Sequence, residues 1–540
     1  MRLPEQSPQL PDTYAALLAR IVAERRDHEA IVTPDEALTY AELDRRSAEM
    51  ARALLALGAG KGARIGLMAP DGVMWLVTLI AGLRIGALVT LVSTLATAPE
   101  LHHIMRNSDV QYLIATRKFL RHDYVTTLEK ALPGLADGRP GALRLPAAPY
   151  LRAVWLDDAE GVSWARPLAE LTARAGEIGV DLLAAAEAEV APRDDAVIIY
   201  TSGSTSVPKA VTHTQWNITR HPIALAPYFT IRRDDRMMSL LPAFWLGGLA
   251  TTMQLLAVGA TLVYGKSPDP EDTLDALVRF NCNALHSWGI RHTRLRELAL
   301  ARGMDINKIR GLGTLFDKNG EPIPPHLQVN SMGMSESFSP HSAEPLDVPL
   351  PESKPGAAGR AVNGYERRVV DPETGLEVPR GTVGEMQIRG GALMSGFYKR
   401  SREEVFTVDG FYPTGDLARM DEDDWVWFLG RRVEMIKTGT ANVSRQEVEA
   451  ALLKLPEVKW TYVAGLPDEE LGQLVAAAVV PAEGTSPTEE GLRTALRETL
   501  STYKIPRRII FITDDEIRLT ATGKIKLNEM ADMIAERIAS

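Results

Sequence analysis

Short apolar runs alternate with helical patterns through most of this chain. The apolar runs cover residues 64–69, 88–93, 111–116, 237–241 and 260–264. Residues 75–83, between the first two runs, have a helical pattern. Residues 39–57 predict an amphipathic helix that stops at Gly58, because its leucine and methionine positions recur at helical spacing. Strand-like runs that alternate with helices are typical of parallel-rich sheets, so the sequence predicts an α/β fold.

The pattern changes near residue 362. From there to residue 430, strand-like pieces at 368–378, 385–389 and 425–429 are separated by Gly and Asp turns and predict hairpins. After Arg431 a compact α+β pattern follows: a helix through Leu455 opened by a capping box of Ser444 and Glu447, a strand at 474–480, a helix at 489–500, a strand at 508–512 and a helix from 528. We therefore predict a large N-terminal domain, residues 1–431, and a small one, residues 432–540.

Composition narrows the class of protein. A chain of 540 residues exceeds what one core usually supports, which agrees with two domains. The net charge is −10 and there is no long basic tract, so nucleic acid is not an expected partner. The single cysteine, Cys282, has no second thiol for a disulfide or a metal, and the first ten residues lack a signal-peptide core, which favours the cytoplasm. The apolar segment 73–98 is interrupted by Arg84 and predicts a buried helix and strand, with no membrane span.

One loop carries the strongest chemical signal. Residues 196–200 read as a buried strand, which runs into Thr201, Ser202, Gly203, Ser204, Thr205 and Ser206, followed by Pro208 and Lys209. Backbone N–H groups, several hydroxyls and one ammonium at such density suit a polyphosphate. A Ser/Thr-rich surface turn is the alternative interpretation of this loop alone.

Further motifs follow this loop in a fixed order. They are residues 330–336 (NSMGMSE), residues 412–416 (YPTGD), Gly430-Arg431 and Thr522-Gly523-Lys524. In this order the set resembles the AMP-forming adenylate synthetases: acyl-CoA ligases, luciferases and the adenylation domains of peptide synthetases. The resemblance extends from about residue 12 to 535. It implies a large multi-subdomain N-terminal domain and a small mobile α+β C-terminal domain.

The resemblance assigns roles to individual residues. It implies a nucleotide site, for ATP and AMP, made by Thr201, Ser202, Gly203, Ser204, Thr205, Lys209, Met332, Gly333, Ser335, Asp416 and Arg431. Glu336, helped by Thr205, matches the carboxylate that binds Mg²⁺. Lys524 matches the lysine that stabilises the charge on the α-phosphate. After rotation of the small domain, the loop from Lys437 to Ser444, with Gly439, Thr440 and Asn442, lines the channel for the thiol of coenzyme A.

A pocket motif limits which kind of acid can be the substrate. Residues 241–248 include Trp245, Gly247 and Gly248, and Trp245 stands where peptide-synthetase domains carry an Asp for the amino group of their substrate. The resemblance therefore implies a hydrophobic acid without an α-amine. Trp245 as a purely structural core residue is the alternative. A homodimer is the default expectation for the assembly, and the sequence does not identify the acid.

Several residues depart from the family pattern. Ser206 and Ala210 replace glycines, Met332 replaces an aromatic residue, Val433 replaces the usual hinge residue, and Thr440 replaces a glycine. A side chain in a phosphate loop costs about 1 kcal/mol where positive φ is needed, which supports the hypothesis that adenylation is weak or lost while supplied acyl-adenylate is still converted. The alternatives are a full two-step ligase, a luciferase-like oxygenase and a nucleotide-binding pseudoenzyme.

Overall fold

The computed structural model describes residues 10–201, 208–287, 289–362, 364–431, 435–518 and 525–539. Its central sheet has eight strands. The third to the eighth strands in spatial order run parallel to one another, and the first two strands pair antiparallel at one edge. In spatial order they are β20 (Gly396–Phe397), β11 (Lys209–Thr214), β10 (Asp195–Thr201), β4 (Leu88–Leu91), β3 (Arg64–Met68), β5 (Tyr112–Ala115), β8 (Ala153–Leu156) and β9 (Arg166–Pro167). The predicted strand before the Ser/Thr-rich loop is β10.

A second sheet stands beside the first and is parallel except at β2. Its strands, in spatial order, are β14 (Ala284–His286), β12 (Arg236–Ser239), β13 (Thr261–Val263), β1 (Glu29–Val32) and β2 (Ala37–Thr39). The five apolar runs predicted from the sequence are β3, β4, β5, β12 and β13, so the α/β prediction is confirmed. Cys282 lies just before β14 and is buried and free.

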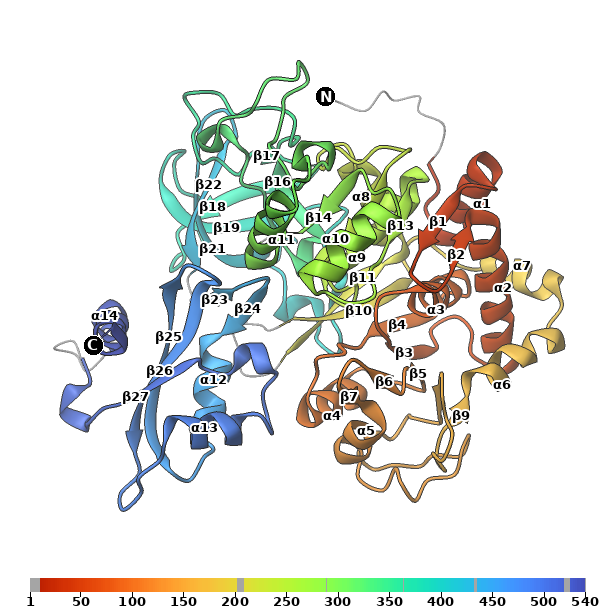
Figure 1. Cartoon of the computed structure of the whole chain (residues 1–540), viewed down its shortest axis with the longest axis horizontal. Coiled ribbons are helices and arrows are strands. Elements are labelled where there is room, and N and C mark those ends of the chain that lie inside the picture. The colour runs from red at the N-terminus through yellow and green to blue at the C-terminus, as the bar shows by residue number, and fades with distance from the viewer. Residues whose placement is uncertain are drawn as a thin grey trace.

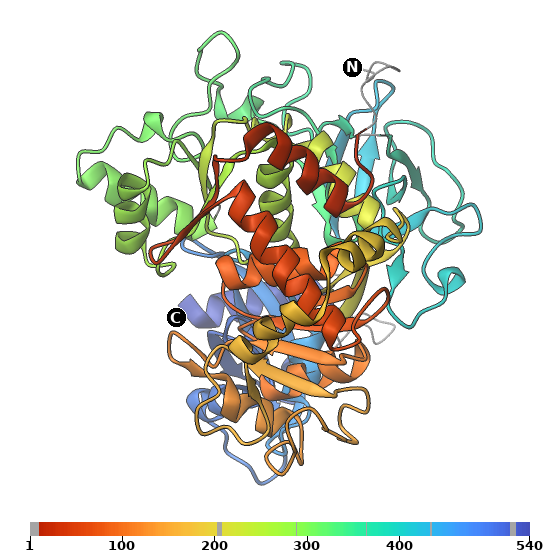
Figure 2. The same cartoon turned by 90° about the vertical axis from the view of Figure 1, so that its right-hand side faces the viewer.

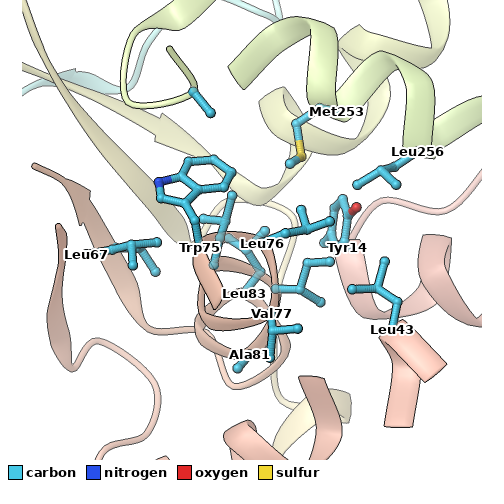
Figure 3. Packing of buried hydrophobic residues seen from close by; sticks show 14 of the residues in the cluster. Tyr14, Leu43, Leu67, Trp75, Leu76, Val77, Ala81, Leu83, Met253 and Leu256 are labelled. Atoms are coloured by element: carbon cyan, nitrogen blue, oxygen red, sulfur yellow. The ribbon is translucent and has the colours of Figure 1, made fainter. Parts of the chain in front are cut away.

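Helix α3 (Val73–Arg84) forms the centre of the main core. Its buried side chains include all residues but Met74, and Figure 3 shows Trp75 and Leu76 packed with Met253 of α9 (Leu246–Val258). Tyr14 and Leu43 close the core from the side of α1 and α2. The remaining helices of this part are α1 (Tyr14–Arg25), α2 (Tyr40–Ala56), α4 (Ala98–Asn107), α5 (Tyr124–Ala131), α6 (Leu168–Ala173), α7 (Val180–Ala188), α8 (Gln215–Leu225), α10 (Pro270–Arg279) and α11 (Gly289–Ala301). Figure 2 shows the two N-terminal helices, in red, lying across the outside of this core.

A local sequence signal explains where helix α2 begins. The side chain of Thr39 accepts from the N–H of Glu42, whose carboxylate accepts in return from the N–H of Thr39, so α2 begins with a complete capping box. The predicted helix at residues 39–57 is thus α2. The predicted apolar segment 73–98 is α3 followed by β4. In the described part of the chain, no helix is both long and apolar enough to cross a membrane.

Antiparallel strands dominate from residue 332 to residue 431. One sheet contains β18 (Glu366–Val370), β19 (Val383–Arg389), β21 (Tyr412–Met420) and β22 (Val426–Arg431), and another contains β15 (Met332–Met334), β16 (Ser339–Ala343) and β17 (Arg360–Ala361). A short hairpin elsewhere joins β6 (Lys118–Phe119) and β7 (His122–Asp123). The predicted hairpin region is confirmed. We call residues 10–431 the large lobe.

Residues 435–539, the small lobe, build a separate sheet (Figure 1). Its elements are β23 (Met435–Thr438), β24 (Ala441–Ser444), α12 (Arg445–Leu452), β25 (Val458–Asp468), β26 (Gly472–Pro481), α13 (Glu489–Leu496), β27 (Arg508–Phe511) and α14 (Leu527–Ala539). Helices α12 and α13 cover the face towards the large lobe, and α14 covers the opposite face.

The predicted capping box at Ser444 is wrong in one half. Ser444 Oγ accepts from the N–H of Glu447 at 3.3 Å, but the Glu447 carboxylate binds Lys504 instead of returning to Ser444. The helix also ends at Leu452, three residues before the predicted end. An ion pair with a buried ammonium is a stronger partner for this carboxylate than one backbone N–H.

Candidate active site

A cavity of about 480 Å³ lies where the two lobes meet. Residues predicted from four separate stretches of sequence line it: Thr201, Lys209, Trp245, Gly247, Gly248, Gly333, Ser335, Glu336, Thr440 and Asn442. Lys209 begins β11, opposite Thr201 at the end of β10, and its ammonium lies 5.2 Å from the centre of the Phe397 ring. The fold therefore brings the end of β10, the start of α9, the β15 turn and the β23–β24 hairpin to one place.

Other predicted residues are not part of this wall. Met332 is buried and packs in the core beside the β18–β22 sheet, so it presents no surface to the cavity. Lys437 is exposed, with its ammonium 5.1 Å from the centre of the Phe428 ring, and Gly439 lies in the turn beyond it. Residues 202–205 and Lys524 lie outside the described residues, as do Ser206 and Val433. For Arg431 only the backbone, at the end of β22, is described.

Residues 414–416 form a bulge inside β21, where we expected a turn. Gln387 of β19 pairs with Pro413 and Glu385 pairs with Leu417, so three residues of β21 lie opposite the single residue Met386 of β19. Gly415 has a φ of +73° and donates its N–H to Glu385 Oε1 at 3.0 Å. Thr414 and Gly415 line the cavity, while Asp416 is buried beside them and donates its N–H to Thr414 Oγ1. The bulge turns this piece of strand towards the cavity.

The Glu336 carboxylate is held in a defined place in the wall. It lies in a short turn between β15 and β16, and Tyr412 Oη donates to its Oε1 at 3.2 Å. The two residues after this turn, Phe338 and Ser339, have φ values of +46° and +92° although neither is glycine. Packing must impose this conformation, and the fully buried Phe338 ring contacts the His213 ring at 5.0 Å. His213 also binds the carbonyl of Ser335, so its role is to hold this turn.

Two glycines allow close approach of backbone segments around the cavity. A Cβ on Gly248 would lie 2.3 Å from the carbonyl oxygen of Pro242, and one on Gly333 would lie 2.6 Å from that of Ser339. Both contacts are with backbone, which cannot move aside cheaply. These positions accept only glycine, and the first of them brings the start of α9 against residues 241–242.

Trp245 combines the two roles that the sequence left open. It precedes the first turn of α9, packs against the edge of the main core and lines the cavity. Its ring meets those of Phe244 at 5.2 Å and Tyr503 at 5.8 Å, both edge to face. Because Tyr503 belongs to the small lobe, Trp245 is also a contact between the lobes.

Sequence reasoning missed a charged cluster in the cavity wall. Lys504 Nζ lies 2.6 Å from Glu100 Oε1 of the large lobe and 2.8 Å from Glu447 Oε1 of the small lobe. Ser501 Oγ donates to the other oxygen of Glu100 at 2.7 Å. Burial alone would lower the pKa of Lys504, but Tyr503 and the two carboxylates hold it above its usual value. The pKa of Glu447 is raised by burial, whereas the pKa of Glu100 is lowered, because Lys504 together with the hydrogen bonds from Thr97 and Ser501 outweighs burial.

A second missed group lies along α9. Thr251 and Gln254 line the cavity together with His286 at the end of β14. Burial lowers the pKa of His286 to about 4, so this ring is neutral. The spacing of Gly247, Thr251 and Gln254 puts them on one side of a helix whose other residues are apolar or core-facing. This polar stripe is the signal that the sequence offered.

Two protein-family models match this chain. The family model described as AMP-binding enzyme matches residues 18–398, and the model of the AMP-binding enzyme C-terminal domain matches residues 447–524. The chain belongs to the AMP-binding enzyme family. The predicted resemblance to AMP-forming acyl-CoA ligases is confirmed, and so is the fold of a large and a small domain. This AMP-binding enzyme is therefore an acid–thiol ligase by family.

Individual relatives are distant but cover nearly the whole chain. The medium-chain acyl-CoA ligase ACSF2 of Mus musculus is 27% identical over 95% of this chain and 86% of its own length. The sulfoacetate–CoA ligase of Cupriavidus necator is 28% identical over 96% of this chain and 97% of its own. Among solved structures, the amide bond synthetase McbA from Marinactinospora thermotolerans matches with a TM-score of 0.75 and 23% identity, over 96% of this chain and 99% of its own. That last likeness concerns the fold alone.

Proposed function

We propose that this enzyme joins a non-amino carboxylic acid to coenzyme A by way of an acyl-adenylate. The observation that supports this most is the shared cavity, where Lys209 and Glu336 of the large lobe meet Thr440 and Asn442 of the small lobe. A phosphate-binding wall and a thiol-channel loop are both needed for the two half-reactions. Helix α9, beside Trp245, contains no carboxylate that would pair with a substrate ammonium, which favours an acid without an α-amine.

The residues present fit a bound Mg·ATP. Mg²⁺ in nucleotide sites takes one or two protein carboxylates together with phosphate oxygens. Glu336 offers such a carboxylate at the cavity wall, where its Oε1 accepts from Tyr412 Oη. Lys209 supplies a cation on the same wall. A bound Mg²⁺ would neutralise phosphate charge. Roles for Asp416 and Arg431 at the ribose and for residues 201–205 at the phosphates remain part of this proposal.

The lobe arrangement corresponds, in this proposal, to thioester formation. The β23–β24 hairpin contributes Thr440 and Asn442 to the cavity, whereas α14, which follows Lys524, covers the face of the small sheet away from the large lobe. Lys524 would serve the first half-reaction after rotation of the small lobe. We place the hinge at the junction of residues 1–431 and 432–540, which includes Val433.

Weak adenylation remains part of the proposal, but the structure changes which residue supports it. Ala210 lies in β11 opposite Tyr200, is buried against Ile198 and does not have a positive φ. Glycine is therefore not needed at residue 210. The hypothesis now depends on Ser206, because β- and γ-phosphates are present only while ATP is bound. A full two-step ligase is the alternative.

Two assays test this function. The enzyme is given ATP, acid and coenzyme A in one, and synthetic acyl-adenylate and coenzyme A in the other, and the acyl-CoA product is measured. Faster turnover in the second assay, together with recovery of acid-dependent pyrophosphate release in Ser206→Gly, supports weak adenylation. Equal turnover in both assays identifies a full ligase. Absence of thioester in both contradicts the proposed function, and oxidised product would instead indicate a luciferase-like reaction.

A further inference from the structure

Helix α9 separates two environments. Figure 3 shows Met253 and Leu256 pointing into the main core, towards α3 and Tyr14. Thr251 and Gln254 are on the other side and line the cavity. The helix is buried along nearly its whole length, so its polar residues meet only the protein and whatever occupies the cavity. What they bind is therefore protein, water in the cavity or a ligand.

Thr251 and Gln254 differ in whether the protein satisfies them. Thr251 Oγ1 donates to the carbonyl of Gly247 at 2.9 Å and is hydrogen-bonded to His286 Nδ1. Gln254 has an exposed fraction of only 2%, and within the described part of the chain its side-chain amide has no hydrogen-bond partner. The amide is therefore able to hydrogen-bond whatever occupies the cavity. The pocket therefore holds a donor and an acceptor that the fold leaves for a ligand.

The chemistry of the surrounding wall limits what this ligand group is. One turn before Gln254, Ala250 and Thr251 line the cavity, and beyond them lie His286, which is hydrogen-bonded to Thr251, and Phe229, whose ring contacts that of His286. None of them carries a charge, because His286 is neutral. A second carboxylate or a sulfonate at this end would be desolvated without a counter-ion, which is expensive. A wholly apolar acyl chain would leave the Gln254 amide unpaired.

We infer that the acid carries a neutral oxygen function, a hydroxyl or keto group, in its acyl part, and that the Gln254 amide hydrogen-bonds it. This inference rests on the proposed function, since it takes this end of the cavity as the acyl site. It adds a polar group to the hydrophobic acid expected from the sequence, and the hydrophobic character of the acid stays a prediction. A site built to hydrogen-bond a hydroxyl discriminates against its methyl analogue far more strongly than an apolar pocket separates similar hydrocarbons.

Binding tests this inference independently of turnover. Acyl-sulfamoyl-adenosine analogues are prepared in pairs that exchange a hydroxyl for a methyl group: 4-hydroxybenzoyl and 4-methylbenzoyl, 3-(4-hydroxyphenyl)propanoyl and 3-(4-methylphenyl)propanoyl, and 8-hydroxyoctanoyl and nonanoyl. Their Kd values are measured by calorimetry for the full-length enzyme, Gln254→Met and Met253→Leu. We expect at least one pair to favour the hydroxyl member by ~10–100-fold. That ratio should collapse in Gln254→Met and persist in Met253→Leu, a similar change on the core side of α9.

Thermal unfolding adds a second reading. Replacing an unpartnered amide by a thioether of similar volume should leave the stability of the unliganded Gln254→Met variant unchanged or raised. Preference for the methyl member in every pair would overturn the inference, as would a ratio that Gln254→Met leaves intact. Analogues that bind with the expected ratio while no acid or acyl-adenylate yields thioester would contradict the proposed function and leave the role of Gln254 standing.

Discussion

The two halves of the cavity wall are held in place by different forces. In the large lobe, Gly248 and Gly333 pack against backbone, and buried rings fix the turn at Glu336. The small lobe meets this wall through the Lys504–Glu100 ion pair and the Trp245–Tyr503 ring contact. Close-packed contacts of this kind do not deform cheaply, whereas a charged or ring contact between the lobes can separate and re-form. One half is therefore preformed, and the other is suited to docking and release.

Glu336→Gln, a change in the preformed half of the wall, should have the largest effect on activity. Glutamine keeps the volume and the acceptor for Tyr412 Oη but removes the charge proposed to bind Mg²⁺. Acid-dependent pyrophosphate release should fall by ~10²–10³-fold, as when one preorganised electrostatic group is lost. Conversion of supplied acyl-adenylate should fall far less, since it involves no β- or γ-phosphate. Stopped assays of each half-reaction measure the two rates.

Glu344→Gln is the control, because Glu344 is bound to Arg360 and does not line the cavity. It should leave both half-reactions unchanged. Equal loss of both steps in Glu336→Gln would contradict the division of labour that we propose for this wall.

Between pH 7 and pH 5, acid should weaken the large lobe more than the small one. His213, His221, His286 and His341 are buried and have pKa values lowered by burial to about 4, 3, 4 and 3, whereas residues 435–539 contain no histidine. A histidine whose folded pKa lies below its unfolded value stabilises fully above about pH 6.5, and that stability is lost as pH falls.

His221→Phe isolates one of these groups. Both nitrogens of His221 lack a partner in the described structure, and its neighbours are the Phe338 and Tyr365 rings. In His221→Phe, the free energy of unfolding lost between pH 7 and pH 5 should be smaller by ~2 kcal/mol. Urea unfolding at several pH values measures this change. An unchanged slope would show that His221 is protonated or solvated in the folded enzyme.

Local signals in the sequence predicted much of the large lobe, and long-range contacts account for what was missed. Helix α2 was found because Thr39 and Glu42 form its capping box within one turn. Strand β25 was not predicted, because Gly465 and Pro467 interrupt its pattern and pairing with β26 overrides them. The sequence did not reveal the Lys504 cluster, since Lys504 and Glu100 are 404 positions apart.

The candidate site shows the same limit. Motif order located Glu336, Trp245 and Thr440 at the cavity, because each motif is a short local sequence. It did not predict that residues 414–416 bulge or that Met332 faces the core. Those outcomes depend on the register of neighbouring strands, which a single sequence does not state.

Glu100→Gln should loosen the docked half. Glutamine at residue 100 can still complete the capping box of α4 with Thr97, but Lys504 loses one of its two carboxylates. Thioester formation from acyl-adenylate should slow by ~10-fold, about 1.4 kcal/mol, while pyrophosphate release changes less. Rapid-quench measurement of acyl-CoA formation checks this rate.

Glu42→Gln is a matched control for Glu100→Gln. Glu42 makes the same capping box with Thr39, with the same N–H···Oε2 distance of 2.8 Å, on an exposed helix end. Any cost of weakening the box itself appears in this variant. If Glu42→Gln slows thioester formation as much as Glu100→Gln does, the ion pair between the lobes plays no part in docking.

The hairpin that the small lobe brings to the cavity gives the smallest expected effect and the finest test. Its two-residue turn is Gly439-Thr440, and only Gly439 has a positive φ, +59°, while Thr440 does not. Gly439→Ala should therefore cost about 1–2 kcal/mol in the turn, and slow thioester formation several-fold. Thr440→Gly relieves no backbone strain and should change that rate by less than about two-fold, since a glycine exchange costs under ~1 kcal/mol here. A marked gain in Thr440→Gly would instead mean that the threonine side chain obstructs the thiol, and that the departure at residue 440 limits the second half-reaction.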